Sequence, residues 1–168
     1  MPNTASAITE MKNQWLASQV DVEFPTPESL KGHELYQARA LAQETHLLDL
    51  NELSLDEFSE QDVFVADFHR MTVMFALQQA KQWQSQQDRE WIVEFFTQII
   101  YSAPCQLIVA FKGNQPVGAA LVTTHQGAAL VSDVVVEPEY KRHDLIAAIV
   151  SKLELNQCDA VYVEHSAH

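Results

Sequence analysis

The chain has 168 residues, of which 47% are hydrophobic and 9% aromatic, and its formal net charge is −13. This length and composition are typical of one folded domain, residues 1–168, and exclude a disordered chain. Ten basic residues against 23 acidic ones argue against a nucleic-acid or anionic-membrane surface. No apolar run approaches the ~20 residues of a membrane span, and the N-terminus resembles no signal peptide, so we expect a cytoplasmic protein.

Residues 1–103 are predicted to be mainly helical, because apolar residues recur there with the helical period. We expect helices over residues 5–19, 34–48, 62–84 and 89–101, a short strand over 20–24, and a helical turn over 54–57. The turn is expected because Ser54 and Glu57 match a capping box. The start of the third helix has two interpretations, since residues 63–65 also suit a strand. We expect the apolar stripe of that helix in the core: Phe64, Phe68, Met71 and Phe75.

Residues 104–168 change to the period of two that is typical of strands. We expect an antiparallel meander of three strands (106–111, 117–124, 128–136), a helix over 139–155 and a last strand over 159–164. A strand, a helix and a strand in succession imply a parallel pair. The sequence therefore predicts an α/β (α+β) protein with a mixed sheet and an enlarged helical N-terminal half.

Residues 134–150, VVVEPEYKRHDLIAAIV, place an apolar strand, a proline turn, a basic pair and an amphipathic helix in succession. This segment resembles the cofactor-binding strand-turn-helix of the GNAT acyl-CoA N-acyltransferase superfamily. Residues 111–118 are also similar to a hairpin of that family, and the match covers residues 89–165. The resemblance implies acyl-CoA or acetyl-CoA as co-substrate, with its pantetheine paired to the backbone of Val134, Val135 and Val136. A buried central strand would explain the same three valines without a ligand.

The resemblance also implies a pyrophosphate site at the turn, where the family has [Gln/Arg]-x-x-Gly-x-[Gly/Ala]. Here Lys141 takes the first position, while Asp144 and Ile146 take the two glycine positions. Side chains obstruct the approach of phosphate to backbone N–H groups, and a carboxylate repels it. We therefore expect the side chains of Lys141 and Arg142 to bind the phosphates, with a solvated surface turn as the alternative.

The family continues after its fifth strand with a helix and two strands, whereas this sequence ends soon after residues 159–164. We therefore expect the free edge of that strand to be protected in one of three ways. A strand from the N-terminal segment could pair with it, and residues 20–24 are the best candidate. Alternatively, a second protomer could pair with it, or the long helices could cover it. We favour a homodimer, because the chain is rich in hydrophobic residues.

Acyl transfer to an amine requires a base and a site that stabilises the thioester oxyanion. Glu137, at the end of the central strand, and Asp133, within it, are the candidate catalytic bases. A structural hydrogen bond or solvent exposure would also explain Asp133. Glu164 and His165 end the last strand and are further candidates, while His125 is expected to be a solvated turn residue.

Other chemistries find no support in the sequence. It has no G-x-S-x-G elbow and no nucleotide-binding glycine loop. Cys105 and Cys158 lack the spacing of a zinc site, and we expect two free thiols. We predict no specific metal site, although His165 and His168 would suit adventitious binding. The first functional interpretation is acyl transfer from acyl-CoA to an amine, and the second is a GNAT-like interaction or regulatory protein without catalysis.

Overall fold

The computed structural model describes residues 4–166, so His168 lies outside the described residues. The elements follow in the order α1 (Thr4–Ser18), α2 (Pro27–Ala40), β1 (Gln43–Leu47), η1 (Leu50–Glu52), η2 (Glu60–Asp62), β2 (Val63–Val65), α3 (His69–Ala80), α4 (Gln86–Phe96), β3 (Cys105–Lys112), β4 (Gln115–His125), β5 (Ala128–Val136), α5 (Arg142–Lys152), η3 (Leu155–Gln157) and β6 (Ala160–Ser166). Between residues 4 and 166, each helix is too short or too polar to cross a membrane.

Six strands form one mixed sheet in the order β1-β6-β5-β4-β3-β2. Strands β5 and β6 are parallel, and the other four pairs are antiparallel. Strands β3, β4 and β5 are the predicted meander, and α5 connects β5 to its parallel neighbour β6. The predicted α+β fold with a mixed sheet is therefore confirmed.

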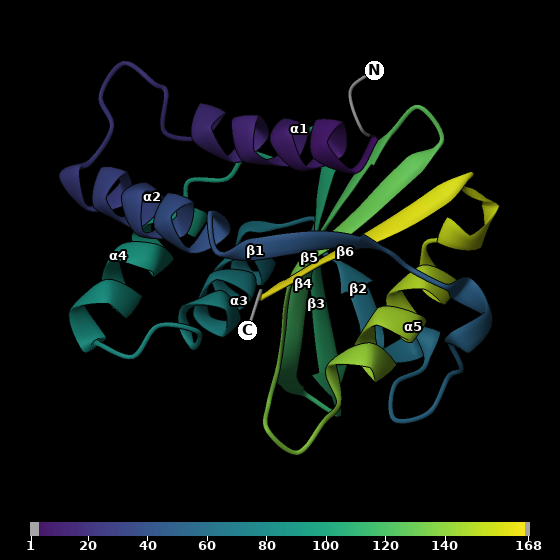
Figure 1. Cartoon of the computed structure of the whole chain (residues 1–168). Coiled ribbons are helices and arrows are strands. Elements are labelled where there is room, and N and C mark those ends of the chain that lie inside the picture. The colour runs from purple at the N-terminus through teal and green to yellow at the C-terminus, as the bar shows by residue number, and fades with distance from the viewer. Residues whose placement is uncertain (1–3, 167–168) are drawn as a thin grey trace.

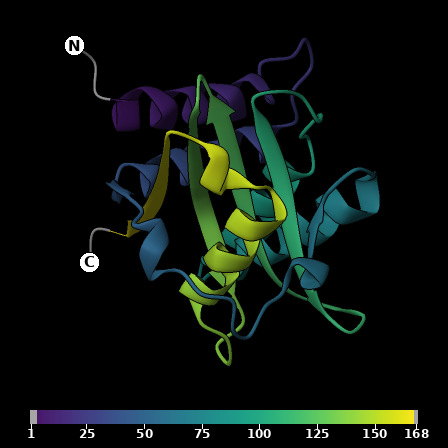
Figure 2. The same ribbon diagram turned by 90° about the vertical axis from the view of Figure 1, so that its right-hand side faces the viewer.

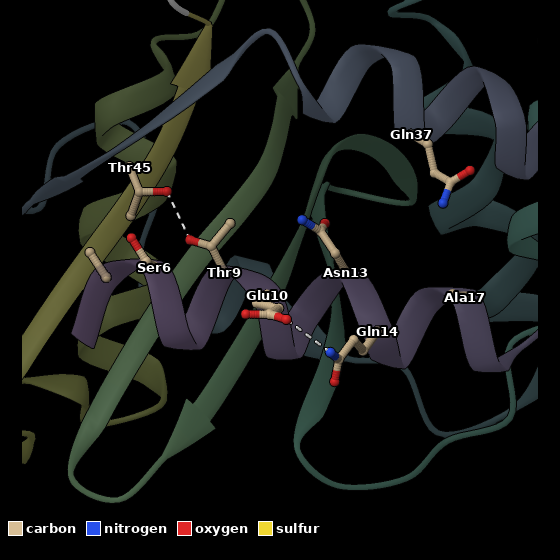
Figure 3. Close-up of a pocket in the computed structure, with 9 residues that line it drawn as sticks. Ser6, Thr9, Glu10, Asn13, Gln14, Ala17, Gln37 and Thr45 are labelled. Atoms are coloured by element: carbon tan, nitrogen blue, oxygen red, sulfur yellow. Dashed lines mark hydrogen bonds between the residues drawn. The ribbon is translucent and has the colours of Figure 1, made fainter. Parts of the chain in front are cut away.

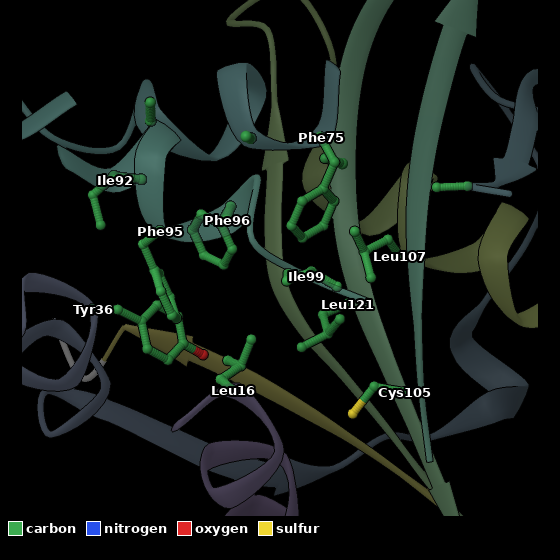
Figure 4. Close-up of a cluster of buried hydrophobic side chains, with 14 of the residues drawn as sticks. Leu16, Tyr36, Phe75, Ile92, Phe95, Phe96, Ile99, Cys105, Leu107 and Leu121 are labelled. Atoms are coloured by element: carbon green, nitrogen blue, oxygen red, sulfur yellow. The ribbon is translucent and has the colours of Figure 1, made fainter. Parts of the chain in front are cut away.

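Helices cover both faces of the sheet: α1 to α4 lie on one face (Figure 1) and α5 on the other (Figure 2). Alternate residues of β3 point to opposite faces, as the strand period requires. Leu107 packs in the cluster of Phe75 and Phe96 on the α3–α4 side (Figure 4), whereas Ile108 packs with Ile149 on the α5 side. The central strands are apolar on both faces because both faces are covered.

The N-terminal half departs from the prediction mainly at the ends of its helices. Helix α2 begins at Pro27, where Thr26 caps the backbone N–H of Ser29, and it ends at Ala40. Residues 43–47, predicted as the end of this helix, form β1 instead. Their hydrogen bonds to β6 outweigh a weak local helix preference. Residues 20–24 form turns and bends, so the predicted strand there is wrong.

Of two further local predictions, one was wrong and one was partly right. The helical turn over 54–57 is absent, and the capping box belongs to Ser59 and Asp62 on η2. The segment 62–84 contains β2 followed by α3, so its alternative interpretation as a strand is the correct one at 63–65. Met71 and Phe75 are buried as predicted, but Phe64 and Phe68 are 45% and 55% exposed. The core stripe is therefore half as long as predicted.

The edge of β6 is covered within the chain. Strand β1 pairs with it antiparallel, from Gln43 opposite Ser166 to Leu47 opposite Tyr162. The N-terminal half thus donates a strand, which was one of the three expected outcomes, but the strand comes from residues 43–47. The homodimer stays a prediction, now without an open β6 edge to motivate it. Cys105 and Cys158 are both free, as predicted.

Candidate functional site

Strands β5 and β6 separate halfway along their length. Their pairing runs from Ala128 opposite Ala160 to Val131 opposite Val163, although both strands continue. Just beyond this point Asp133 has a φ of 55°, and the register between β4 and β5 shifts. A β-bulge of this kind bends its strand and redirects a side chain. The sheet therefore opens at Asp133, and residues 134–136 have no strand partner on the β6 side within residues 4–166.

A cavity of about 390 Å³ lies at this opening. It is lined by Arg39, Gln43, Gln82, Asp133, Val134, Arg142, Glu164, His165 and Ser166. These residues come from α2, β1, the segment after α3, β5, α5 and β6. The cavity is therefore a product of the tertiary structure, and it brings together five residues that the sequence indicated: Asp133, Val134, Arg142, Glu164 and His165.

A fully buried lysine, Lys12, connects the charged side chains beside this cavity. The Nζ of Lys12, on α1, donates to both carboxylate oxygens of Glu164 at 2.9 Å and to the Oη of Tyr36 at 2.8 Å. Tyr36 in turn donates to the Oδ2 of Asp133 at 3.0 Å, and Lys12 lies 3.9 Å from the same oxygen. The lysine thus connects α1 and α2 to both carboxylates of the opening.

Asp133 is fixed by contacts at both its side chain and its backbone. Its Oδ2 also accepts from the Oγ of Ser132 at 2.7 Å, and its carbonyl accepts from Gln79 Nε2 at 2.7 Å. Aspartate is one of the few residues that tolerate the left-handed conformation observed here. The side chain is paired and also lines the cavity, so the structural and functional interpretations of Asp133 coexist.

Burial changes the proton affinity of the cluster. Desolvation, followed by the charge of Asp133, raises the pKa of Glu164 above its ordinary value, and Lys12 only partly opposes this. Burial also raises the pKa of Tyr36 well above its usual value, with Asp133 and Glu164 adding to the effect. Tyr36 therefore keeps its proton at neutral pH and remains a donor. A carboxyl with a raised pKa is better matched to general-base chemistry than an ordinary surface carboxylate.

The predicted phosphate-binding residues have separate surroundings. Arg142 points inward and donates from Nη2 to the carbonyl of Glu164 at 2.6 Å, bridging the gap between α5 and β6. Lys141 is exposed at the N-cap of α5, and its backbone N–H donates to Glu57 Oε1 at 3.2 Å. Of the two predicted phosphate-binding side chains, that of Lys141 is therefore exposed at the turn and that of Arg142 is half-buried.

The two positions where the family has glycine are buried. Ile146 is 4% exposed and packs in the core under α5, and Asp144 is 2% exposed in the first turn of that helix. One oxygen of Asp144 lies 3.3 Å from His143 Nε2, and the other is buried without a partner among the described residues. A carboxylate thus occupies the first turn of α5, where the resemblance implied a phosphate.

Glu137 does not join the cavity. It ion-pairs with Lys81 at the end of α3, and Gln78 donates to the same carboxylate oxygen at 3.5 Å. It follows Asp133 by four residues, about 13 Å along an extended strand. The structure therefore separates the two predicted bases and places Glu164, the secondary candidate, beside Asp133. His125 is exposed, as expected for a turn residue.

Sequence reasoning missed Lys12, Tyr36, Arg39 and Gln79. A signal for Lys12 was present, because it shares one helical face with Ile8, Trp15 and Leu16. A lysine in the middle of an apolar stripe must find a buried anion. No comparable signal marks Tyr36, whose position depends on the packing of α2.

A second cavity, of about 550 Å³, lies along α1 and β1 (Figure 3). Its walls carry short polar side chains, with a Thr9–Thr45 hydroxyl contact of 2.9 Å at one end and a Gln14–Glu10 hydrogen bond of 3.1 Å along the helix. None of the sequence-predicted site residues lines it. Within residues 4–166, no group of three or more His, Cys, Asp or Glu side chains is placed to hold a metal ion.

Comparison with known proteins found no matching family model and no matching curated protein. Solved structures do match. A GCN5-related N-acetyltransferase from Kribbella flavida is 13% identical, with a TM-score of 0.46 over 76% of this chain and 53% of that one. A conserved protein of unknown function from Staphylococcus epidermidis ATCC 12228 is 17% identical, with a TM-score of 0.48 over 80% and 56%.

A PaiA N-acetyltransferase from Thermoplasma acidophilum, solved in complex with coenzyme A, is 13% identical, with a TM-score of 0.36 over 68% of this chain and 72% of that one. This chain spans about half the length of the first two matches. The matched structures thus include proteins described as N-acetyltransferases.

Proposed function

We propose that this protein is an N-acyltransferase that moves an acyl group from acyl-CoA to an amine. The observation that carries the proposal is the separation of β5 from β6 beyond Val131, directly beside a charged cavity that contains Asp133. The free side of β5 at residues 134–136 supplies backbone groups for the pantetheine amides. The cavity, within the usual size range of small-molecule sites, takes the acceptor amine.

In the reaction the amine nitrogen attacks the thioester carbonyl, so a C–N bond forms and the C–S bond breaks. The amine must first lose a proton, and a carboxylate in the cavity accepts it. Asp133 takes this role, and a second carboxylate, Glu164, whose pKa burial raises, lies behind it. Coenzyme A leaves as the thiolate and takes a proton from solvent. Backbone N–H groups of β5 stabilise the oxyanion that forms during attack.

In this proposal Lys141 binds the phosphates of CoA. Its side chain is exposed at the start of α5, where the helix dipole also favours an anion. Arg142, predicted for the same task, points toward the cavity instead. We therefore expect Lys141→Ala to weaken the binding of CoA and to reduce its salt dependence, because one charge-assisted contact to phosphate is lost.

A thermal-shift titration with acetyl-CoA and with a long-chain acyl-CoA tests binding, since a ligand that binds only the native state raises its stability. A thiol-release assay with a panel of amines then tests transfer. Asp133→Asn keeps a side chain that tolerates the left-handed bulge and removes the base. We expect it to lower kcat by about 10²–10⁴-fold. No shift with either acyl-CoA, or full activity in Asp133→Asn, contradicts the proposal.

A second candidate function is a GNAT-like binding or regulatory module without catalysis. Two carboxylates favour it: Glu57 accepts the backbone N–H of Lys141, and Asp144 is buried in the first turn of α5. Both lie where the pyrophosphate of CoA would sit, and both repel it. The two candidates differ in the titration above. If Glu57→Gln creates acyl-CoA binding that the wild type lacks, this second function is supported.

We also propose a cytoplasmic homodimer. Leu47 on β1 and Phe64 on β2 are 68% and 45% exposed, and these are the two edge strands of the sheet. Apolar residues on unpaired edges favour association with a second copy. Sedimentation equilibrium tests the assembly, and a monomer at high concentration contradicts it.

A further inference from the structure

Two arginines converge on the cavity between β5 and β6. Arg39 comes from α2 and Arg142 from the first turn of α5, and both line the same 390 Å³ space. Neither guanidinium has an ion-pair partner within residues 4–166, although acidic residues outnumber basic ones by more than two to one in this chain.

Both guanidinium groups are held in place but retain free donors. Arg39 donates from Nη2 to Gln82 Oε1 at 2.6 Å and lies 5.5 Å from the ring centre of Trp83. Arg142 donates to the carbonyl of Glu164. An arginine has five N–H donors, so each has further donors to offer a ligand in the cavity. Burial lowers the pKa of Arg142; the charges of Asp133 and Glu164 oppose this shift in part, and the charge of Arg39 adds to it.

The carboxylates of the cavity act on Arg142 through their charge, but their hydrogen bonds go to other groups. Both oxygens of Glu164 are engaged by Lys12, and the Oδ2 of Asp133 accepts from Tyr36 and Ser132. Three cations therefore surround two carboxylates, which leaves one positive charge in excess. An anion between the arginines would offset it, and bidentate binding of a carboxylate suits the guanidinium geometry.

Charges of both signs line this one cavity. We propose that the acceptor is an amine that also carries a carboxylate, as a free amino acid does, with its carboxylate between Arg39 and Arg142 and its amine toward Asp133. This inference rests on the proposed function, because it names the class of the acceptor. A plain alkylamine or polyamine has no carboxylate and would leave the two arginines unpaired. The site should therefore prefer amines that carry a carboxylate over amines that do not.

Calorimetric titration of the cofactor-free protein tests the site directly. The probes are the common amino acids and then the C-terminal amide of the tightest binder, which keeps the amine and the side chain but removes the anion. We expect the amide to bind at least about tenfold more weakly. Arg39→Gln and Arg142→Gln should each weaken the acid by about tenfold and leave the amide nearly unchanged. Arg70→Gln, an exposed arginine on α3 that does not line the cavity, is the matched control.

Equal binding of acid and amide overturns the inference, and so does the absence of binding by any amino acid. An equal loss for both probes in Arg142→Gln would mean that this arginine only braces β6. Arg39 is partly exposed, so Arg39→Gln keeps the test available if the other variant fails to fold. Amino-acid binding without acyl transfer would contradict the proposed function alone. Transfer to amines with and without a carboxylate at equal kcat/KM would contradict the inference alone.

Discussion

Replacing Lys12 by Met tests whether the buried cluster stabilises the opened sheet. The variant keeps the length of the side chain and removes its charge. Lys12 is 0% exposed, and its Nζ contacts both oxygens of Glu164, which is itself 3% exposed. Removing one partner of a buried ion pair costs about 3–5 kcal/mol, because the remaining charge is left uncompensated. That is a large part of the about 5–15 kcal/mol that stabilises an ordinary domain.

The stability lost in Lys12→Met should depend on pH in a defined direction. Burial already raises the pKa of Glu164 in the folded protein, and removal of Lys12 raises it further. A carboxyl whose folded pKa exceeds its unfolded pKa is most favourable to folding at low pH, and this contribution is lost as the pH rises through the folded pKa. We therefore expect Lys12→Met to lower the free energy of unfolding more at pH 8 than at pH 5, because a larger share of the Glu164 carboxyl is protonated, and so uncharged, at the lower pH.

Urea denaturation at both pH values measures the deficit as a change in midpoint at constant slope. The double variant Lys12→Met with Glu164→Gln should recover much of the loss, since it removes the uncompensated charge. Lys81→Met is the matched control, because Lys81 pairs with Glu137 at a side chain that is 49% exposed and should cost less than about 1 kcal/mol. A deficit below about 1 kcal/mol, or one that is equal at the two pH values, would refute the reasoning.

Two further predictions concern the core. A Cβ on Gly32 would lie 2.1 Å from the carbonyl oxygen of Trp91, so Gly32→Ala must push α2 away from α4. We expect it to lower the free energy of unfolding by about 1–3 kcal/mol despite the better helix propensity of Ala, and an unchanged denaturation midpoint would contradict the close contact. Burial raises the pKa of the Cys105 thiol to about 11. At pH 8 iodoacetamide should therefore modify Cys158 at least about tenfold faster than Cys105 in the native protein, as measured by mass spectrometry. In urea the two cysteines should react at similar rates. Equal rates in the native protein would count against the burial of Cys105.

The sequence by itself determined the sheet half of the protein. Strands β3, β4 and β5 and helix α5 are specified by local patterns: turns with glycine, alternation of apolar residues and a helical apolar face. Each pattern lies within one element, so the prediction of that element does not depend on distant contacts. The same locality allowed Asp133 to be noticed, since a carboxylate in an apolar strand is costly unless it is paired or faces a cleft.

Only the tertiary structure decided the remainder. Residues 43–47 become a strand because the edge of β6 offers hydrogen bonds that a helix end cannot use, and this preference is invisible in the segment itself. Likewise, Lys12, Tyr36 and Glu164 are separated by up to 152 residues in sequence, yet they form one hydrogen-bonded group. Desolvation makes that group necessary, since a buried charge is stable only beside its partner, and the partner is chosen by how α1 and α2 pack on the sheet.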